Sequence, residues 1–95
     1  MKILSGKFKN QSVSISRKFV YRPTTSIVRK SLFDALKSLE GRNFLDLYAG
    51  SGMIGFEASS RGADNVTFIE MNKQHMIQIR NSAESIPYSN FNFLV

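Results

Sequence analysis

The stretch Asp46-Leu47-Tyr48-Ala49-Gly50-Ser51-Gly52-Met53-Ile54-Gly55 decides how the rest of the chain is interpreted. Gly50, Gly52 and Gly55 fit the pattern G-x-G-x-x-G, and Glu70 stands twenty residues after the first of them. In nucleotide-binding α/β folds, the first two glycines permit a tight turn close to the ligand, and the third lets a helix pack on the strand. An acid at this offset accepts hydrogen bonds from ribose hydroxyls. The alternative is a structural turn beside a surface acid.

Asp46 bears on which nucleotide such a loop would hold. A carboxylate four residues before the first glycine would repel a pyrophosphate, whereas it suits a ligand with an ammonium and a sulfonium group. The charge therefore favours S-adenosylmethionine over NAD or FAD. In the simpler alternative, Asp46 is a strand-end acid bonded to nearby backbone amides.

The segments around this stretch alternate between strand and helix patterns. Gly62 is expected to close the first helix and Asn72 to cap the second, whose Met76, Ile77 and Ile79 are expected to face the core. The order strand, helix, strand, helix, strand is typical of a parallel α/β sheet. Strands are predicted over residues 44–48, 66–70 and 91–95, and helices over residues 54–61 and 73–85.

The first 42 residues follow different patterns. Apolar and polar residues alternate around Gly6 and Asn10, which tolerate positive φ, and this predicts a β-hairpin or short ribbon over residues 2–20. The run Arg22-Pro23-Thr24-Thr25 is typical of a helix start. An apolar stripe then predicts an amphipathic helix that Gly41 ends. The stripe consists of Val28, Leu32, Leu36 and Leu39, with Phe33 beside it.

Charge divides the chain at the same point. Residues 1–42 hold ten basic and two acidic residues, whereas residues 43–95 hold three basic and five acidic ones, and the whole chain has a net charge of +6. Such a basic segment suits a polyanion, and RNA is the predicted partner. A solvated basic surface is the alternative. The candidate RNA contacts are Lys7, Lys9, Arg17, Lys18 and Arg22.

Composition excludes several classes of function. The 95 residues include no cysteine, so a disulfide framework, a Cys-ligated zinc site and a thiol nucleophile are ruled out. His75 is the only histidine and is expected to be solvated; alone it cannot build a metal site. No apolar run approaches the ~20 residues of a membrane span. We therefore expect a soluble, cytoplasmic protein that binds neither metal nor membrane.

Three ordered motifs carry a family resemblance. The run Asp46 to Gly52 is continued by Gly55-Phe56-Glu57-Ala58 and Ser60-Arg61-Gly62-Ala63. It is preceded by Arg22-Pro23-Thr24-Thr25 with Val28-Arg29-Lys30-Ser31-Leu32-Phe33, and by the opening Ile3-Leu4-Ser5-Gly6-Lys7-Phe8-Lys9. Together these motifs closely resemble the bacterial small-subunit ribosomal RNA guanine-N2 methyltransferases.

The resemblance implies a Rossmann-like, S-adenosylmethionine-dependent methyltransferase fold and assigns roles to residues. Arg22 to Thr25 would flank the cofactor and the target base, and Asn10 stands where the family usually has glycine. By resemblance, the cofactor-binding residues are Asp46, Tyr48, Ala49, Gly50, Ser51, Gly52, Glu70 and Thr24.

The family's Asp/Asn-Pro-Pro-aromatic motif does not occur, so no catalytic residue is assigned. We expect one truncated domain, with a basic part (residues 1–42) and a cofactor-binding half (residues 43–95), whose exposed sheet edge favours self-association. One alternative is a non-catalytic RNA- or ribosome-binding module derived from such an enzyme. A fragment of an NAD-dependent oxidoreductase is disfavoured by Asp46.

Overall fold

The computed structural model describes residues 1–13 and 25–95. From residue 43 onward the expected alternation of strands and helices is confirmed, and each boundary lies within one residue of its predicted position. Arg17, Lys18, Arg22 and Thr24 lie outside the described residues. The elements, in chain order, are α1 (Ser26–Leu36), β1 (Asn43–Leu47), α2 (Met53–Ser60), β2 (Asn65–Ile69), α3 (Lys73–Glu84) and β3 (Phe91–Leu94).

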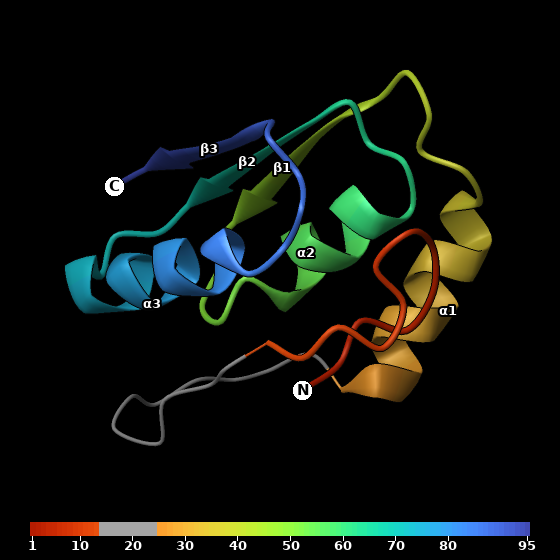
Figure 1. Ribbon diagram of the computed structural model, residues 1–95, viewed down its shortest axis with the longest axis horizontal. Helices are drawn as coiled ribbons and strands as arrows, with labels where there is room; N and C mark the ends of the chain where they lie inside the picture. Colours follow the sequence, from red (N-terminus) through yellow and green to blue (C-terminus); the bar gives the residue numbers. More distant parts are fainter. Residues whose placement is uncertain (14–24) are drawn as a thin grey trace.

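The three strands form a parallel sheet in the order β1-β2-β3. In the register, Asp46 lies beside Phe68, which lies beside Phe93. Figure 1 shows α2 and α3 against the same face of this sheet, with α1 and the N-terminal segment beyond α2. The predicted α/β architecture is therefore confirmed, with the helices on one face.

The other face of the sheet carries apolar side chains that the described residues leave open. Leu45, Leu47 and Leu94 lie on this face and are 54%, 56% and 55% exposed. Parallel sheets are ordinarily covered on both faces. This surface is therefore apolar where a parallel sheet would usually meet a second layer.

Aromatic rings fill the core between α2, α3 and the sheet. Phe56 and Phe68 are fully buried, with ring centroids 5.0 Å apart, and Phe68 stacks on Phe93 at 5.8 Å. A Cβ at Gly55 would lie 2.2 Å from the ring of Phe68. Only glycine lets α2 approach β2 this closely, so the packing role predicted for Gly55 is confirmed.

Helix α1 begins as predicted but ends earlier. The Thr25 hydroxyl accepts a hydrogen bond from the Val28 amide at 3.3 Å, which caps the first turn. The helix stops at Leu36, and Lys37 takes a φ of 60°, so the expected end at Gly41 is wrong. The Leu39 amide donates to the carbonyl of Arg61 at 3.2 Å, which draws the chain out of the helical path.

The face of α1 that is buried also differs from the prediction. Val28, Leu32 and Leu36 are 55%, 41% and 45% exposed, whereas Arg29 and Phe33 are buried. The reason is tertiary. Arg29 pairs with an acid on α2, and the ring of Phe33 packs against Phe44 with centroids 5.9 Å apart. These two contacts turn Val28, Leu32 and Leu36 outward, whereas Leu39, the last residue of the predicted stripe, lies beyond the helix and is buried.

The core prediction for α3 holds in part, and its cap is confirmed. The Asn72 side chain accepts hydrogen bonds from the amides of Gln74 and His75. Met76 and Ile79 are buried, but Ile77 is 57% exposed. Ile77 was wrongly predicted as a core residue because it lies on the side of the helix that faces away from the sheet.

Residues 1–13 form a compact loop, which we call the N-terminal loop. One antiparallel bridge joins Lys2 and Ser12, and the amide of Asn10 donates to the carbonyl of Ile3 at 2.8 Å. Gly6 and Asn10 take φ values of 90° and 70°, as expected. The predicted hairpin is thus present as a turn with one bridge, and its expected continuation over residues 14–20 lies outside the described part of the chain.

Candidate cofactor site

The glycine loop between β1 and α2 turns tightly at the carboxyl edge of the sheet. Tyr48, Gly50 and Gly52 take φ values of 54°, 57° and 83°. The Gly52 amide donates to the carbonyl of Ala49 at 2.8 Å, and Gly52 forms the N-cap of α2 in a left-handed conformation. A Cβ at Gly52 would lie 2.8 Å from the ring of Phe56. The pattern therefore makes the tight turn that its spacing predicted.

Glu70 joins this loop to the start of α3. Its Oε1 accepts a hydrogen bond from the Gly50 amide at 2.9 Å, and its Oε2 accepts one from the Asn72 amide at 2.8 Å. The side chain is 11% exposed. Each carboxylate oxygen has a second lone pair, so these bonds leave acceptor capacity for a further donor. Glu70 is thus a fixed, partly accessible carboxylate beside the loop.

His75 lies beside Glu70, contrary to its predicted position. Its Nδ1 lies 3.9 Å from Oε1 of Glu70, and its side chain is only 14% exposed, so the expectation of a solvated histidine is wrong. Asn72 links the two residues, because its amide donates to Glu70 while its side chain accepts from the His75 amide. The predicted cap three residues earlier was the signal that could have placed His75 here.

Asp46 lies beneath the loop and is nearly buried, at 7% exposed. Its Oδ2 accepts a hydrogen bond from the Gly55 amide at 3.0 Å, which ties the end of β1 to the first turn of α2. The pKa of Asp46 is raised to about 7, mainly by burial; the Gly55 hydrogen bond opposes this shift, and the charge of Glu70 adds to it. The amide contact is the one expected in the simpler alternative for this residue.

The remaining candidate residues differ in accessibility. Tyr48 is 84% exposed, Ala49 and Gly50 are half-buried, and Ser51 is buried at 6% exposed. The segment from Asp46 to Gly55 contains two glycines in tight turns, one acid and no basic residue. The loop thus combines backbone groups with two carboxyl groups, Glu70 beside it and Asp46 beneath it. Such a set of groups fits a ligand that carries positive charge better than it fits a pyrophosphate.

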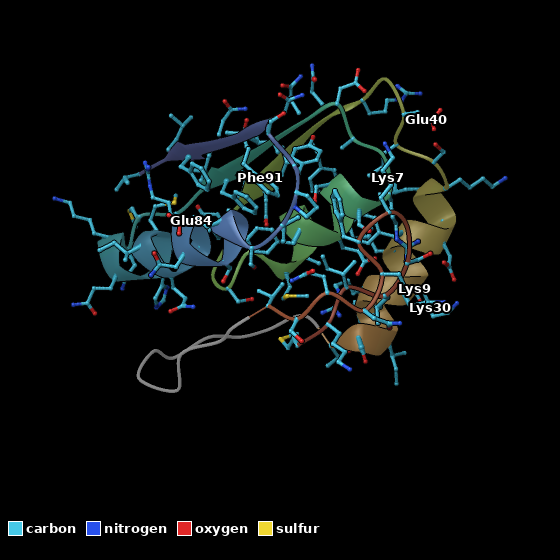
Figure 2. The ribbon with its side chains drawn as sticks, in the orientation of Figure 1. Lys7, Lys9, Lys30, Glu40, Glu84 and Phe91 are labelled. Atoms are coloured by element: carbon cyan, nitrogen blue, oxygen red, sulfur yellow. The ribbon has the colours of Figure 1, made fainter. Side chains whose placement is uncertain are left out.

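Basic side chains gather on a different part of the molecule. Lys7 and Lys9 on the N-terminal loop and Lys30 on α1 are exposed, and Figure 2 shows them towards the same end. Lys30 is paired with Asp34 at 2.5 Å, and this hydrogen bond lowers the pKa of the Asp34 carboxyl. Lys7 and Lys9 are the exposed bases of the N-terminal loop that were predicted to meet RNA.

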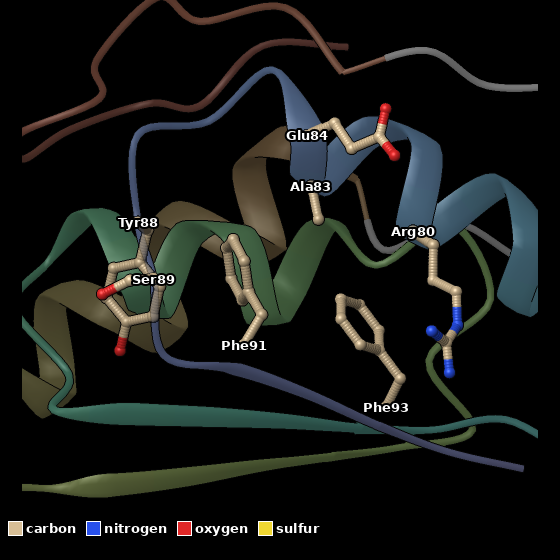
Figure 3. Close-up of a pocket in the computed structure, with 7 residues that line it drawn as sticks. All are labelled: Arg80, Ala83, Glu84, Tyr88, Ser89, Phe91 and Phe93. Carbon is tan, nitrogen blue, oxygen red and sulfur yellow. The ribbon is translucent and has the colours of Figure 1, made fainter.

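A separate aromatic cleft of about 310 Å³ lies between α3 and β3 (Figure 3). The guanidinium of Arg80 lies 4.8 Å from the ring centroid of Phe93, and Phe91 and Tyr88 stand beside it, with centroids 4.6 Å apart. Glu84 and Arg80 are the two charged residues that line this cleft. None of the residues that line this cleft belongs to the glycine loop.

The parallel sheet and the glycine loop at its carboxyl edge define a Rossmann-like α/β fold. The chain belongs to the family described as conserved hypothetical protein 95, whose sequence model matches residues 1–94. Among the described residues, no helix is long and apolar enough to span a membrane.

Curated relatives carry methyltransferase names. An uncharacterized methylase of Rickettsia prowazekii (strain Madrid E) is 34% identical over 99 residues, which cover 95% of this chain and 42% of the relative. Ribosomal RNA small subunit methyltransferase D of Buchnera aphidicola subsp. Acyrthosiphon pisum (strain APS) is 34% identical over 85 residues, covering 88% of this chain and 44% of the relative. The resemblance carried by the three motifs is confirmed.

A solved structure supports the same fold. The yhhF protein of Escherichia coli matches with a TM-score of 0.87 at 28% identity, over 99% of this chain and 51% of that protein. The chain therefore spans about half the length of the relatives it matches.

Proposed function

We propose that this chain carries the S-adenosylmethionine-binding half of a methyltransferase that acts on guanine N2 of small-subunit ribosomal RNA. The glycine loop carries the proposal: it turns tightly between Asp46 and Glu70 in a chain whose relatives include ribosomal RNA methyltransferases. A ribosomal RNA substrate also implies the compartment of the ribosome, the cytoplasm. The domain division at residues 42 and 43 is part of this proposal.

Each residue at the loop has a role in this proposal. The cofactor supplies a methyl group on a sulfonium when it is bound. Glu70 accepts hydrogen bonds from the ribose hydroxyls with the lone pairs that Gly50 and Asn72 leave. Asp46 offers a negative charge to the methionine ammonium. The other residues of the proposed site are Tyr48, Ala49, Gly50, Ser51, Gly52 and Thr24.

Asp46 makes the proposed binding dependent on pH. Its pKa of about 7 means that the carboxyl is substantially protonated near neutrality. A bound cation stabilises the ionised form and lowers this pKa. Affinity for S-adenosylmethionine should therefore rise as the pH increases through 7.

RNA is the proposed macromolecular partner, held through its phosphates by the basic residues of the first 42. Lys7 and Lys9 are exposed and available for such contacts. Arg17, Lys18 and Arg22 complete the proposed set. We assign no catalytic group in this chain, because holding an exocyclic amine for transfer requires acceptors and an aromatic face that none of its motifs provides.

Self-association is the second partner proposal. Strand β1 pairs with β2 on one side, and the described residues place no strand on its other side. An unpaired edge beside an open apolar face favours pairing with another copy of the chain. Sedimentation at increasing protein concentration would detect such pairing, and a monomer at all concentrations would exclude it.

Calorimetric titration with S-adenosylmethionine tests the central assignment. Glu70→Ala removes charge-assisted hydrogen bonds worth roughly 1.5–3 kcal/mol each, so its dissociation constant should increase at least about tenfold. Glu40→Ala is the matched control, since Glu40 is exposed and precedes β1, at the opposite end of that strand from the loop. Equal dissociation constants for wild type and Glu70→Ala would contradict the assignment of Glu70 to the cofactor site. Salt-dependent RNA binding without any cofactor binding would favour the non-catalytic module instead.

A further inference from the structure

Glu57 on α2 contacts the N-terminal loop in a way that neither the glycine motif nor the basic charge explains. The residue is fully buried. Its Oε1 accepts a hydrogen bond from the Leu4 amide at 2.8 Å, and its Oε2 accepts one from the Ser5 amide at 3.1 Å. One carboxylate therefore holds two successive amides of a segment more than fifty residues away in sequence.

Two arginines compensate the buried charge of Glu57. Nε of Arg29 lies 3.4 Å from Oε1, and Nε of Arg61 lies 3.1 Å from Oε2. Arg29 is 1% exposed, and its Nη2 donates to the carbonyl of Lys2 at 2.8 Å, so α1 holds the same loop from the other side. Nη1 of Arg29 is buried without a hydrogen-bond partner among the described residues. A buried ion pair with an unsatisfied donor is a weak source of stability, which points to a geometric role.

Ser60, near the end of α2, extends these contacts along the loop. Its hydroxyl accepts a hydrogen bond from the Phe8 amide at 2.9 Å and donates to the Ser5 carbonyl at 2.5 Å. Its carbonyl accepts a hydrogen bond from the Lys7 amide at 2.8 Å. A Cβ at Gly6 would lie 2.0 Å from that carbonyl oxygen. The backbone of residues 4–8 is thus fixed on α2, while the side chains of Lys7 and Lys9 remain exposed.

The same short helix holds the glycine loop at its other end. Helix α2 begins at Met53, with Gly52 as its N-cap, and ends at Ser60. Eight residues span about 12 Å of helix axis, which is short enough to act as a rigid connection. Figure 1 shows α2 between the sheet and the N-terminal loop. The exposed lysines and the proposed cofactor loop are therefore attached to opposite ends of one element.

We propose that Glu57 is a positioning residue that fixes the lysines of the N-terminal loop relative to the glycine loop. This inference rests on the proposed function, in which the lysines meet RNA and the glycine loop holds the methyl donor. Transfer between two bound molecules requires their reacting atoms to be held in register, and small displacements lower the rate steeply. Glu57 fixes the relative position of the two loops through its hydrogen bonds to the Leu4 and Ser5 amides, and it touches neither ligand.

The test uses the full chain and variants that separate position from stability. Glu57→Gln would leave Arg29 charged and unpaired in the interior, so the main variant is the double substitution Glu57→Met with Arg29→Met. Replacing a buried ion pair by apolar residues of similar volume is often tolerated. Ser60→Ala is a milder second variant that removes only the hydroxyl contacts. Asp34→Asn is the matched control, because Asp34 pairs with Arg61 and Lys30 but makes no hydrogen bond to the N-terminal loop.

Three measurements are made on each protein: amide hydrogen exchange of residues 4–8, binding of a small-subunit ribosomal RNA transcript as a function of salt, and titration with S-adenosylmethionine. In both loop variants, these amides should exchange faster and RNA affinity should fall several-fold. The slope of log affinity against log salt should become shallower by up to about 1.4, the value for two phosphate contacts on single strands. The cofactor dissociation constant should match wild type, as should every property of Asp34→Asn.

The outcomes distinguish this inference from the proposed function. Faster exchange with unchanged RNA affinity and slope in Ser60→Ala and in the double variant would overturn the positioning role. Equal losses of cofactor and RNA binding would also overturn it, since Glu57 would then support the whole fold. If the double variant fails to fold, the result with Ser60→Ala decides. A wild-type chain that binds no S-adenosylmethionine would overturn the proposed function itself.

Discussion

Helices α1 and α2 are successive helices of the chain, separated by β1, but they differ in which of their residues are buried. Seven of the eight residues of α2 are buried, including Glu57, Ser59 and Ser60, whereas two of the eleven residues of α1 are buried. The polar residues of α2 are all bonded, as when the Ser59 hydroxyl donates to the Phe56 carbonyl at 2.7 Å. The apolar residues Val28 and Leu36 of α1 are exposed. Burial here follows the available partners and not hydropathy alone.

This difference in burial between α1 and α2 shows what fixes the orientation of each helix. Helix α2 lies between the sheet and the N-terminal loop, so both of its sides meet protein. Helix α1 meets protein on one side, and its orientation is set by Arg29, which needs an acid, and by Phe33, which is fully buried. A buried charge costs several kcal/mol unless it is paired, which exceeds the gain from covering one or two half-exposed leucines.

The largest predicted effect compares two apolar residues of α1. Phe33→Ala removes a fully buried ring and should lower the free energy of unfolding by about 3–5 kcal/mol. Val28→Ala, at a position that is 55% exposed, should change it by no more than about 0.5 kcal/mol. Urea denaturation followed by circular dichroism measures both. Similar losses for the two variants would show that the stripe is buried in solution and that α1 is oriented as its periodicity predicted.

A smaller effect is expected at the contact of α2 with the sheet. Gly55→Ala would place a Cβ at 2.2 Å from Phe68, and relief of this overlap should cost about 1–3 kcal/mol. Gly41→Ala is a useful comparison, since a Cβ there meets no atom within 4 Å although its φ of 76° still disfavours alanine. Thermal denaturation of the two variants measures the difference. If Gly55→Ala were the more stable of the two, α2 would not pack on β2 as described.

The last prediction concerns Asp46 and the dependence of the free energy of unfolding on pH. The pKa of Asp46 is raised to about 7 in the folded state, above its ordinary 3.8, so the folded protein binds this proton more tightly than the unfolded chain. Its contribution to stability is present below pH 4 and is lost as the pH rises towards 7. Asp46→Asn, which keeps an acceptor for the Gly55 amide, should flatten this part of the stability profile. If Asp46→Asn and wild type showed the same dependence of the unfolding free energy on pH between 4 and 7, the raised pKa of Asp46 would be contradicted.

Some of the candidate site could be predicted because its signals are local. Gly50 and Gly52 take positive φ where the pattern required a tight turn, and Asn72 caps the helix that it precedes. The contacts of Glu70 with Gly50 and Asn72 were not foreseen, because they depend on how the loop folds against the end of β2. His75 was misplaced for the same reason.

The alternation of strands and helices after residue 43 could be predicted from local signals, since periodicity, glycines and caps act within a few residues of one another. The burial of Arg29 and the exposure of Leu36, in contrast, depend on contacts between elements. The partner that holds Arg29 in the interior, Glu57, lies on another helix, and nothing in the local pattern of α1 indicates it. Helix periodicity indicates that one face of a helix will be buried, but the strongest long-range contacts determine which face this is.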